Sequence, residues 1–239
     1  MRRWLKAELH SHTIEDPVEG GEIVLHSPQE LISAASQQGF EVLAITNHEQ
    51  MLFSDELRGY AQSRGVLLIP GVEANIQGKH FLLYNFPGYE PSWKDPEVIR
   101  QHKGTRQLVI APHPFFPSRS ALRGRFRQWL DLFDAVEYNH FYLPWLNFNR
   151  RAEEAARRLD KALIGNSDVH HLFQLGRTYS LIFAEMTVES VVSAIKEKQV
   201  QLVTNPVEPS FILRWFVLNA AYRIRYMLRQ KSFGSRAHE

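Results

Sequence analysis

The sequence predicts an α/β fold, a single barrel built from about seven strand-helix units. Its 239 residues are 44% hydrophobic and 23% charged, which is typical of one globular domain with a core of its own. Short aliphatic and β-branched runs alternate with segments of helical spacing, and no linker or repeat interrupts them. An open doubly wound sheet is the structural alternative. No glycine-rich phosphate loop follows any expected strand, which disfavours the nucleotide-binding form of that fold.

The first half of the chain alternates between strands and helices. The expected strands are Leu5–Leu9, Glu41–Thr46, Val66–Ile69 and His80–Phe86. The expected helices are Pro28–Gln38 and Ser54–Arg64. The first of them has apolar residues at helical spacing, a proline at its start and Gly39 as its stop.

The second half continues the same alternation. The expected strands are Leu108–Ala111, Ala135–Tyr138, Ala162–Ile164, Tyr179–Phe183 and Val200–Val203. The expected helical segments are Val98–Lys103, the basic stretch Ser118–Asp131, Phe148–Leu159 and Val188–Lys198. Each strand is short and bounded by polar or turn residues, as buried strands are.

Cysteine is absent, whereas there are eleven histidines. The absence excludes disulfides, zinc fingers, iron–sulfur clusters and thiol nucleophiles. A chain rich in histidine and without cysteine would bind metal through nitrogen and oxygen ligands.

The net charge of +2 is unevenly distributed along the chain. Residues 1–207 carry 22 basic and 24 acidic side chains, whereas residues 208–239 carry six and two. We therefore expect a barrel domain over 1–207, which is not a generic nucleic-acid binder, and a basic C-terminal helical extension over 208–239. No signal peptide or long apolar run is present, so we expect a cytoplasmic protein.

Candidate metal ligands follow the expected strands. They are His10 and His12, His48, Glu73, His113, and Asp168 with His170. In a parallel barrel the carboxyl ends of all strands meet at one mouth, so these loops would converge. Residues two apart in an extended chain face the same side, which lets both members of a pair reach one ion. A carboxylate such as Glu73 can bridge two cations and aim a hydroxide between them. We expect two or three divalent ions, with Zn, Mn and Fe left open.

These motifs resemble the PHP (polymerase and histidinol phosphatase) family. The resemblance runs from about Leu9 to Gly176. Its five motifs occur in family order: His10-Ser-His12, Thr46-Asn47-His48, Gly71-Val72-Glu73, Pro112-His113-Pro114 and Asn166-Ser167-Asp168-Val169-His170. The resemblance implies a distorted TIM-like barrel of the (β/α)7 type.

The resemblance also implies three sets of metal ligands. His10, His12, Glu73 and Asp168 would hold one ion, and Glu73, His80 and His113 a second. His48 and His170 would hold a third with a first-loop acid, for which Asp16 is preferred to Glu15. The sequence departs from the family at Asn47, where aspartate is usual. It also departs at the first-loop acid, which usually stands one residue later than Asp16 and before a glycine.

The activity that the resemblance implies is metal-dependent phosphoester hydrolysis. Glu73 would act as the bridging carboxylate, and His170, or else His171, would protonate the leaving oxygen. From Ile99 to Leu130 there are seven basic residues and no acid, which would attract an anionic substrate. We expect Arg119, and then Arg177, to hold phosphate, and His140 to contact the substrate from the same rim.

Several functions remain open from the sequence. The first is hydrolysis of a small phosphorylated metabolite or nucleotide, with no stable nucleic-acid complex. The second is an exonuclease or oligonucleotide phosphodiesterase of the same chemistry. The third is a metal-poor, non-catalytic module that binds membrane or protein, and an amidohydrolase is a further alternative. The C-terminal helix, expected over Phe211–Lys231, would contact an anionic membrane or pack on its own barrel. The oligomeric state is left open.

Overall fold

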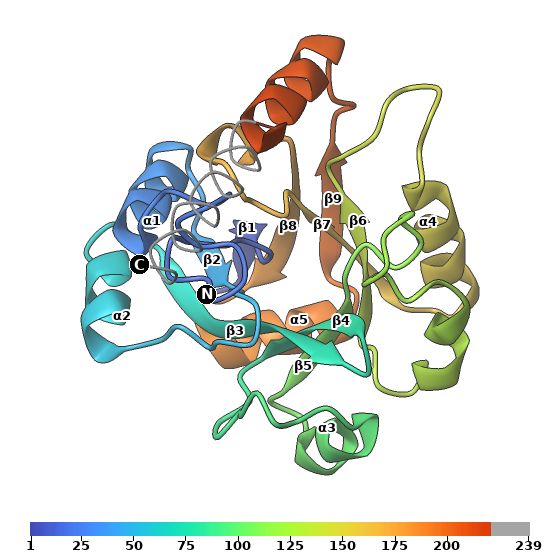
Figure 1. The fold of residues 1–239 in the computed structure, drawn as a ribbon. Coiled ribbons are helices and arrows are strands. Elements are labelled where there is room, and N and C mark those ends of the chain that lie inside the picture. Colours follow the sequence, from blue (N-terminus) through green and yellow to red (C-terminus); the bar gives the residue numbers. More distant parts are fainter. Residues whose placement is uncertain (221–239) are drawn as a thin grey trace, which may run out of the picture.

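Nine strands form one sheet that curls into a nearly closed barrel in the computed structural model (Figure 1), which describes residues 1–220. The strands are β1 (Arg3–Glu8), β2 (Val42–Ile45), β3 (Leu67–Ile76), β4 (Lys79–Tyr84), β5 (Leu108–Ala111), β6 (Ala135–Asn139), β7 (Ala162–Asn166), β8 (Thr178–Ala184) and β9 (Val200–Thr204). Their order in the sheet is β7-β6-β5-β4-β3-β2-β1-β8-β9. The predicted barrel class is confirmed, but the nine strands do not form the seven strand-helix units of a (β/α)7 barrel.

Helices cover the outside of this sheet. They are α1 (Pro28–Gln37), α2 (Asp55–Gln62), α3 (Pro96–His102), α4 (Asn149–Arg158) and α5 (Val188–Lys196). Two 3-10 helices, η1 (Arg123–Trp129) and η2 (Leu172–Gln174), complete the named elements. The predicted basic helix over Ser118–Asp131 was therefore only partly right, because just its second half is helical and it has the tighter 3-10 form. Residues 209–220 are also helical, and the remainder of the expected helix lies outside the described residues.

The sheet is mixed, whereas the sequence led us to expect parallel strands throughout. The pairs β1/β2, β2/β3, β5/β6 and β6/β7 are parallel. The pairs β3/β4, β4/β5, β1/β8 and β8/β9 are antiparallel. The mouth of the barrel therefore collects the carboxyl ends of β1, β2, β3, β5, β6, β7 and β9 and the amino ends of β4 and β8.

The two edges of the sheet meet at Gly165 in β7. A Cβ at this position would lie 2.4 Å from Leu202 Cδ1 in β9 and 2.8 Å from the Tyr179 carbonyl oxygen in β8. Only glycine permits so close an approach. The Ser180 hydroxyl accepts from the Gly165 N–H at 2.9 Å and donates to its carbonyl at 3.2 Å. The Ser180 side chain thus makes hydrogen bonds to the backbone of β7 in place of strand pairing where the barrel closes.

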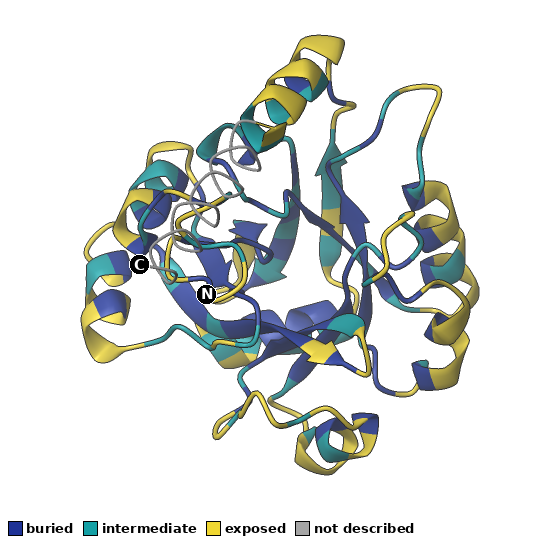
Figure 2. Ribbon diagram, viewed as in Figure 1, coloured by how far each residue is buried: buried dark blue, intermediate teal, exposed yellow. Residues whose placement is uncertain are grey.

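The strands and the helices differ in how far their residues are buried. Figure 2 shows the strands largely buried and the helices exposed on their outer faces. Helix α1 begins at a capping box, in which the Ser27 hydroxyl accepts from the Glu30 N–H and the Glu30 carboxylate accepts from the Ser27 N–H. Its buried residues, which include Leu31 and Ile32, pack on β2 and β3. Within residues 1–220, no helix has both the length and the apolarity needed to cross a bilayer.

Candidate metal centre

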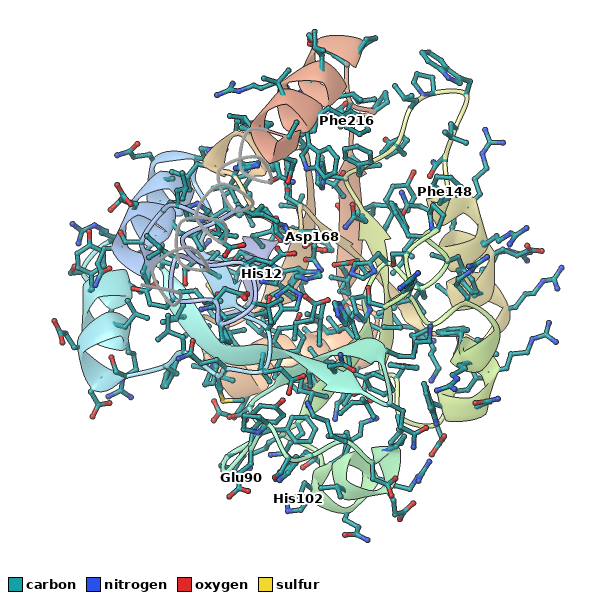
Figure 3. The ribbon with its side chains drawn as sticks, viewed as in Figure 1. His12, Glu90, His102, Phe148, Asp168 and Phe216 are labelled. Carbon is teal, nitrogen blue, oxygen red and sulfur yellow. The ribbon has the colours of Figure 1, made fainter. Side chains whose placement is uncertain are left out.

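The predicted ligands converge at the mouth of the barrel. Figure 3 shows His12 and Asp168 close together at the centre of the molecule, enclosed by the strands. The residues brought together are His10, His12, Asp16, His48, Glu73, His80, His113, Asp168 and His170. All nine predicted ligands therefore lie in one cluster.

Backbone hydrogen bonds join the loops that carry these residues. The His12 N–H donates to Val169 O at 2.9 Å, and the Val169 N–H donates to His10 O at 3.0 Å. The Thr46 N–H donates to Ser11 O at 2.7 Å. The loops after β1, β2 and β7 thus continue the sheet beyond the strands, which fixes their side chains relative to one another.

A tight hairpin brings His80 to Glu73. Strands β3 and β4 are joined by Gln77 and Gly78, whose φ angles are 51° and 77°. Two consecutive residues of positive φ are typical of a two-residue hairpin turn. In the resulting register Asn75 pairs with His80, so Glu73 and His80 lie on the same face. The Nδ1 of His80 is 2.6 Å from Glu73 Oε1.

Four side-chain atoms form a cage with the spacing of a tetrahedral metal site. The Nε2 of His10 is 3.3 Å from Glu73 Oε2 and 3.3 Å from Asp168 Oδ1. The Nε2 of His12 is 3.4 Å and 3.5 Å from the same two oxygens. Metal–ligand bonds of about 2.0–2.1 Å give a tetrahedron with edges of about 3.3–3.4 Å. Both Nε2 atoms are buried and have no hydrogen-bond partner among residues 1–220. These residues therefore fit a divalent ion.

The second oxygen of Glu73 faces a different pair of histidines. Oε1 lies 2.6 Å from the Nδ1 of His80 and 3.4 Å from the Nε2 of His113. The Glu73 side chain is 2% exposed. One buried carboxylate thus presents each of its oxygens to a separate donor group, which is the arrangement of a bridging ligand.

Two of the predicted ligands have a left-handed backbone. The φ angle is 28° at His113 and 48° at Asp168. Residues other than glycine seldom adopt this conformation, and such strain concentrates at functional sites.

Asp16 lies behind two imidazole rings. Its Oδ2 accepts from the Nδ1 of His12 at 2.8 Å and from the Nδ1 of His48 at 2.9 Å. It also accepts from the His48 N–H at 2.8 Å. With their Nδ1 atoms bound to Asp16, the rings direct their Nε2 atoms toward Glu73, at 3.4 Å for His12 and 3.2 Å for His48.

The first loop also supplies Glu19, which the sequence reasoning missed. Its Oε2 lies 2.7 Å from the Nε2 of His170. A signal was present, because Glu19 directly precedes a glycine, as the first-loop acid of the family usually does, although it stands three residues after Asp16 and not one. A Cβ at that glycine, Gly20, would lie 2.1 Å from Ile14 O and 2.4 Å from Asp16 O. The loop could not close with any other residue there.

Asn47 faces away from the histidines. Its Oδ1 accepts from the Thr13 N–H at 2.9 Å, and its Nδ2 lies 2.9 Å from Thr13 Oγ1. Both side chains are fully buried. Asn47 therefore ties the loop after β2 to the loop after β1.

Two buried glutamates support the cluster, and neither was singled out from the sequence. Glu137 Oε1 accepts from the Nδ1 of His10 at 2.8 Å, and its Oε2 accepts from the His113 N–H at 2.7 Å. Glu8 accepts from the backbone N–H groups of His10 and Ser167. Burial raises the pKa of Glu8 to about 8.

The charges of the metal-free cluster stabilise one another. Burial alone would raise the pKa of Glu73, but the neighbouring imidazoles, His80 and His10 foremost, lower it well below its usual range. Burial opposes charge on His10, but the carboxylates around it raise its pKa well above the usual value. The pKa of His170 rises to about 10, because Glu19 and Asp168 outweigh its burial.

The predicted substrate-binding residues stand in the loops after β5, β6 and β7. Arg119 is exposed, and the loop that carries it accepts from the His80 N–H through Ser120 O at 3.0 Å. Arg177 is half-buried, with its guanidinium 5.3 Å from the Phe211 ring centroid. His140 is 2% exposed and lies beneath Phe211, with ring centroids 5.6 Å apart.

Sequence comparisons place the chain among related proteins. A family described as PHP-associated matches residues 147–200. The uncharacterised protein MJ1587 of Methanocaldococcus jannaschii is 30% identical over 151 residues, which cover 58% of this chain and 83% of that protein.

Three solved structures share the fold. PsfC from Pseudomonas syringae superposes with a TM-score of 0.64 at 15% identity, over 92% of this chain and 99% of PsfC. A candidate metal-dependent phosphoesterase from Bifidobacterium adolescentis gives 0.53 at 17% identity, over 72% and 90%. An amidohydrolase from Chromobacterium violaceum gives 0.50 at 13% identity, over 69% and 87%. The PHP-associated match and the five motifs in order on this barrel support the assignment of the chain to the PHP family.

Proposed function

We propose that this protein is a metal-dependent phosphoesterase that acts on a small phosphorylated metabolite or nucleotide. The observation that carries the proposal is the geometry of Glu73, whose two oxygens face two separate groups of buried donors. Such an arrangement suits two ions held close together. The likeness of the fold to a candidate metal-dependent phosphoesterase supports the same chemistry.

The cage residues would hold the first ion and His80 with His113 the second, both sharing Glu73. Ions in these positions would neutralise phosphate oxygens and make a bound water acidic near neutral pH. The chain contributes the positions of the donors, because the hydrogen-bonded loops after β1, β2 and β7 hold them before any ligand arrives.

Asp16 receives a different role from the one expected from the sequence. Both of its oxygens already accept hydrogen bonds, Oδ1 from the N–H groups of Val18 and Glu19 and Oδ2 from His12 and His48. We therefore assign it to orienting the two rings rather than to direct ligation. Carboxylates that hold the far nitrogen of a ligating histidine commonly have this function.

His170 and Glu19 complete the site on the side of the first loop. With a third ion bound, the Nε2 of His170 and the Glu19 carboxylate would hold it together with His48. With two ions, His170 keeps its proton at Nε2 on Glu19 and can deliver it to the leaving oxygen. The exposed Arg119 precedes Ser120, whose carbonyl accepts from the His80 N–H, and it would orient the phosphate.

The test is hydrolysis of a panel of phosphomonoesters and phosphodiesters, with bound metal measured on the same sample. We expect hydrolysis by the wild type after reconstitution with Mn, Fe or Zn, and a loss of at least about 10³-fold in Glu73→Gln. The exposed Glu90→Gln is the matched control and should retain full activity.

Two results would contradict the proposal. One is less than one ion per chain with no hydrolysis of any phosphoester, which favours a non-catalytic module. The other is hydrolysis of amides but not phosphoesters, which favours an amidohydrolase.

A further inference from the structure

A basic groove lies beside the barrel mouth, between η1 and α4. Two adjoining hollows of about 540 Å³ each share Phe115, Arg123, Gly124 and Arg151 in their walls. We call them together the basic groove. Its walls include two aromatic and four basic side chains, namely Phe115, Phe148, Arg123, Arg127, Arg151 and Arg158.

The groove carries excess positive charge. Arg158 forms an ion pair with Glu154, which is the one acid in its walls. Within residues 1–220, no carboxylate lies within salt-bridge distance of Arg123, Arg127 or Arg151, and all three are exposed. Unpaired arginines on facing walls attract anions, and they bind phosphate oxygens with good geometry.

The arginines extend along the groove instead of surrounding one point. Arg151 and Arg158 are seven residues apart on one face of α4, which places them about 10 Å apart along its axis. Arg123 and Arg127 lie on the opposite wall, in η1. A single phosphate group would engage only one end of this row, whereas a chain of phosphates would engage all of it.

Aromatic rings line the end of the groove that is nearest to the metal centre. Phe148 precedes α4, where Figure 3 labels it, and Phe115 lines the same hollow. Flat aromatic surfaces beside a basic track are typical of sites for single-stranded nucleic acid, because any base can stack on them. The Phe116 ring lies 5.6 Å from Phe148 and 6.2 Å from His113. Phe116 therefore connects this end of the groove to His113, a ligand of the proposed second ion.

We propose that the basic groove binds the phosphodiester backbone of a single-stranded oligonucleotide and leads its end to the metal centre. The first part rests on the groove alone, and the second rests on the proposed function. The sequence had led us to expect no stable nucleic-acid complex, because the net charge of the body is negative. In the structure, however, positive charge is concentrated in the basic groove.

The experiment measures binding of a fluorescein-labelled oligothymidylate of about twelve nucleotides to the full chain in EDTA, by fluorescence anisotropy. We expect Arg123→Glu combined with Arg151→Glu to weaken binding at least about tenfold. The slope of log affinity against log salt should become shallower by about one unit, since contacts to a single strand contribute about 0.7 each. Circular dichroism checks that the variant is folded.

Two controls separate the possible outcomes. Arg157→Glu makes the same change about 100° round α4 from Arg158, outside the groove walls, and should bind within twofold of wild type. The exposed Glu90→Gln should also bind within twofold. Because binding is measured in EDTA, a failure of the proposed hydrolysis leaves this result intact. Equal weakening in Arg157→Glu, or unchanged binding in the double variant, would overturn the proposal. Competition by tripolyphosphate as effective as by unlabelled oligonucleotide would overturn the nucleic-acid assignment.

Discussion

The carboxylate of Glu137 lies 2.8 Å from the Nδ1 of His10, and neither side chain is exposed. The two residues come from β6 and from the loop after β1, 127 positions apart in the chain. The contact fixes the ring so that its Nε2 faces Glu73 and Asp168. We therefore infer that Glu137 positions His10, a proposed metal ligand.

Replacing Glu137 by glutamine should weaken metal binding about 10- to 100-fold, because partners of this kind orient the ligating ring. Isothermal titration of the metal-free protein measures the affinity directly. Excess metal should restore the phosphoesterase activity of Glu137→Gln but not that of Glu73→Gln. Wild-type metal affinity in Glu137→Gln would show that the contact has no such role.

Substitutions at Asn47 should affect folding rather than metal binding. Asn47→Ala leaves the buried Thr13 N–H without a partner and should lower the free energy of unfolding by about 1–3 kcal/mol. Asn47→Asp keeps an acceptor at the same place and should unfold nearly as the wild type does. Urea denaturation compares the two. A loss of bound metal without a loss of stability in Asn47→Ala would contradict this assignment.

Metal uptake should release protons. In the metal-free protein His10 has a raised pKa and that of His170 is about 10, so both rings are protonated at neutral pH. Ligation requires the neutral ring, so the apparent affinity should increase as the pH rises from 6 to 8. Calorimetry in buffers of different ionisation enthalpy counts the protons released, and an affinity that falls over this range would refute the expectation.

The closure of the barrel should depend on Gly165. An added methyl group would approach the Tyr179 carbonyl as well as Leu202, so Gly165→Ala should destabilise the protein by about 1–3 kcal/mol. Gly59 lies in the interior of α2 with open space around it. Gly59→Ala should therefore stabilise the protein by about 0.5–1 kcal/mol. Urea midpoints of both variants test the contrast, and equal effects would contradict it.

Much of the fold could be predicted because its elements carry a local signal. The expected strand Leu108–Ala111 has the observed bounds, and the expected helix Pro28–Gln38 ends one residue beyond α1. The direction of β4 was not predicted, although Gln77 and Gly78 mark its hairpin. The expected strand ended at Ile69, whereas β3 continues to Ile76, because Pro70 and Gly71 interrupt its apolar run without ending it.

The ligands of the candidate site were accessible from the sequence, but their supports were not. Each candidate histidine follows or opens a strand within a recognisable motif, and Glu73 follows the apolar run that begins β3. Glu137 and Glu8 lie within strands, and their roles arise only from contacts across the barrel. Alternation within a strand cannot distinguish a buried carboxylate that holds a ligand from one that faces solvent.

One oxygen of Asp16 holds the rings of both His12 and His48. His12 belongs to the proposed first ion, and His48 to the third. A shift of either ring on ligation changes the hydrogen bond that aligns the other, so the two sites cannot fill independently. Stepwise metal titration should be cooperative, and that coupling is transmitted through a single carboxylate.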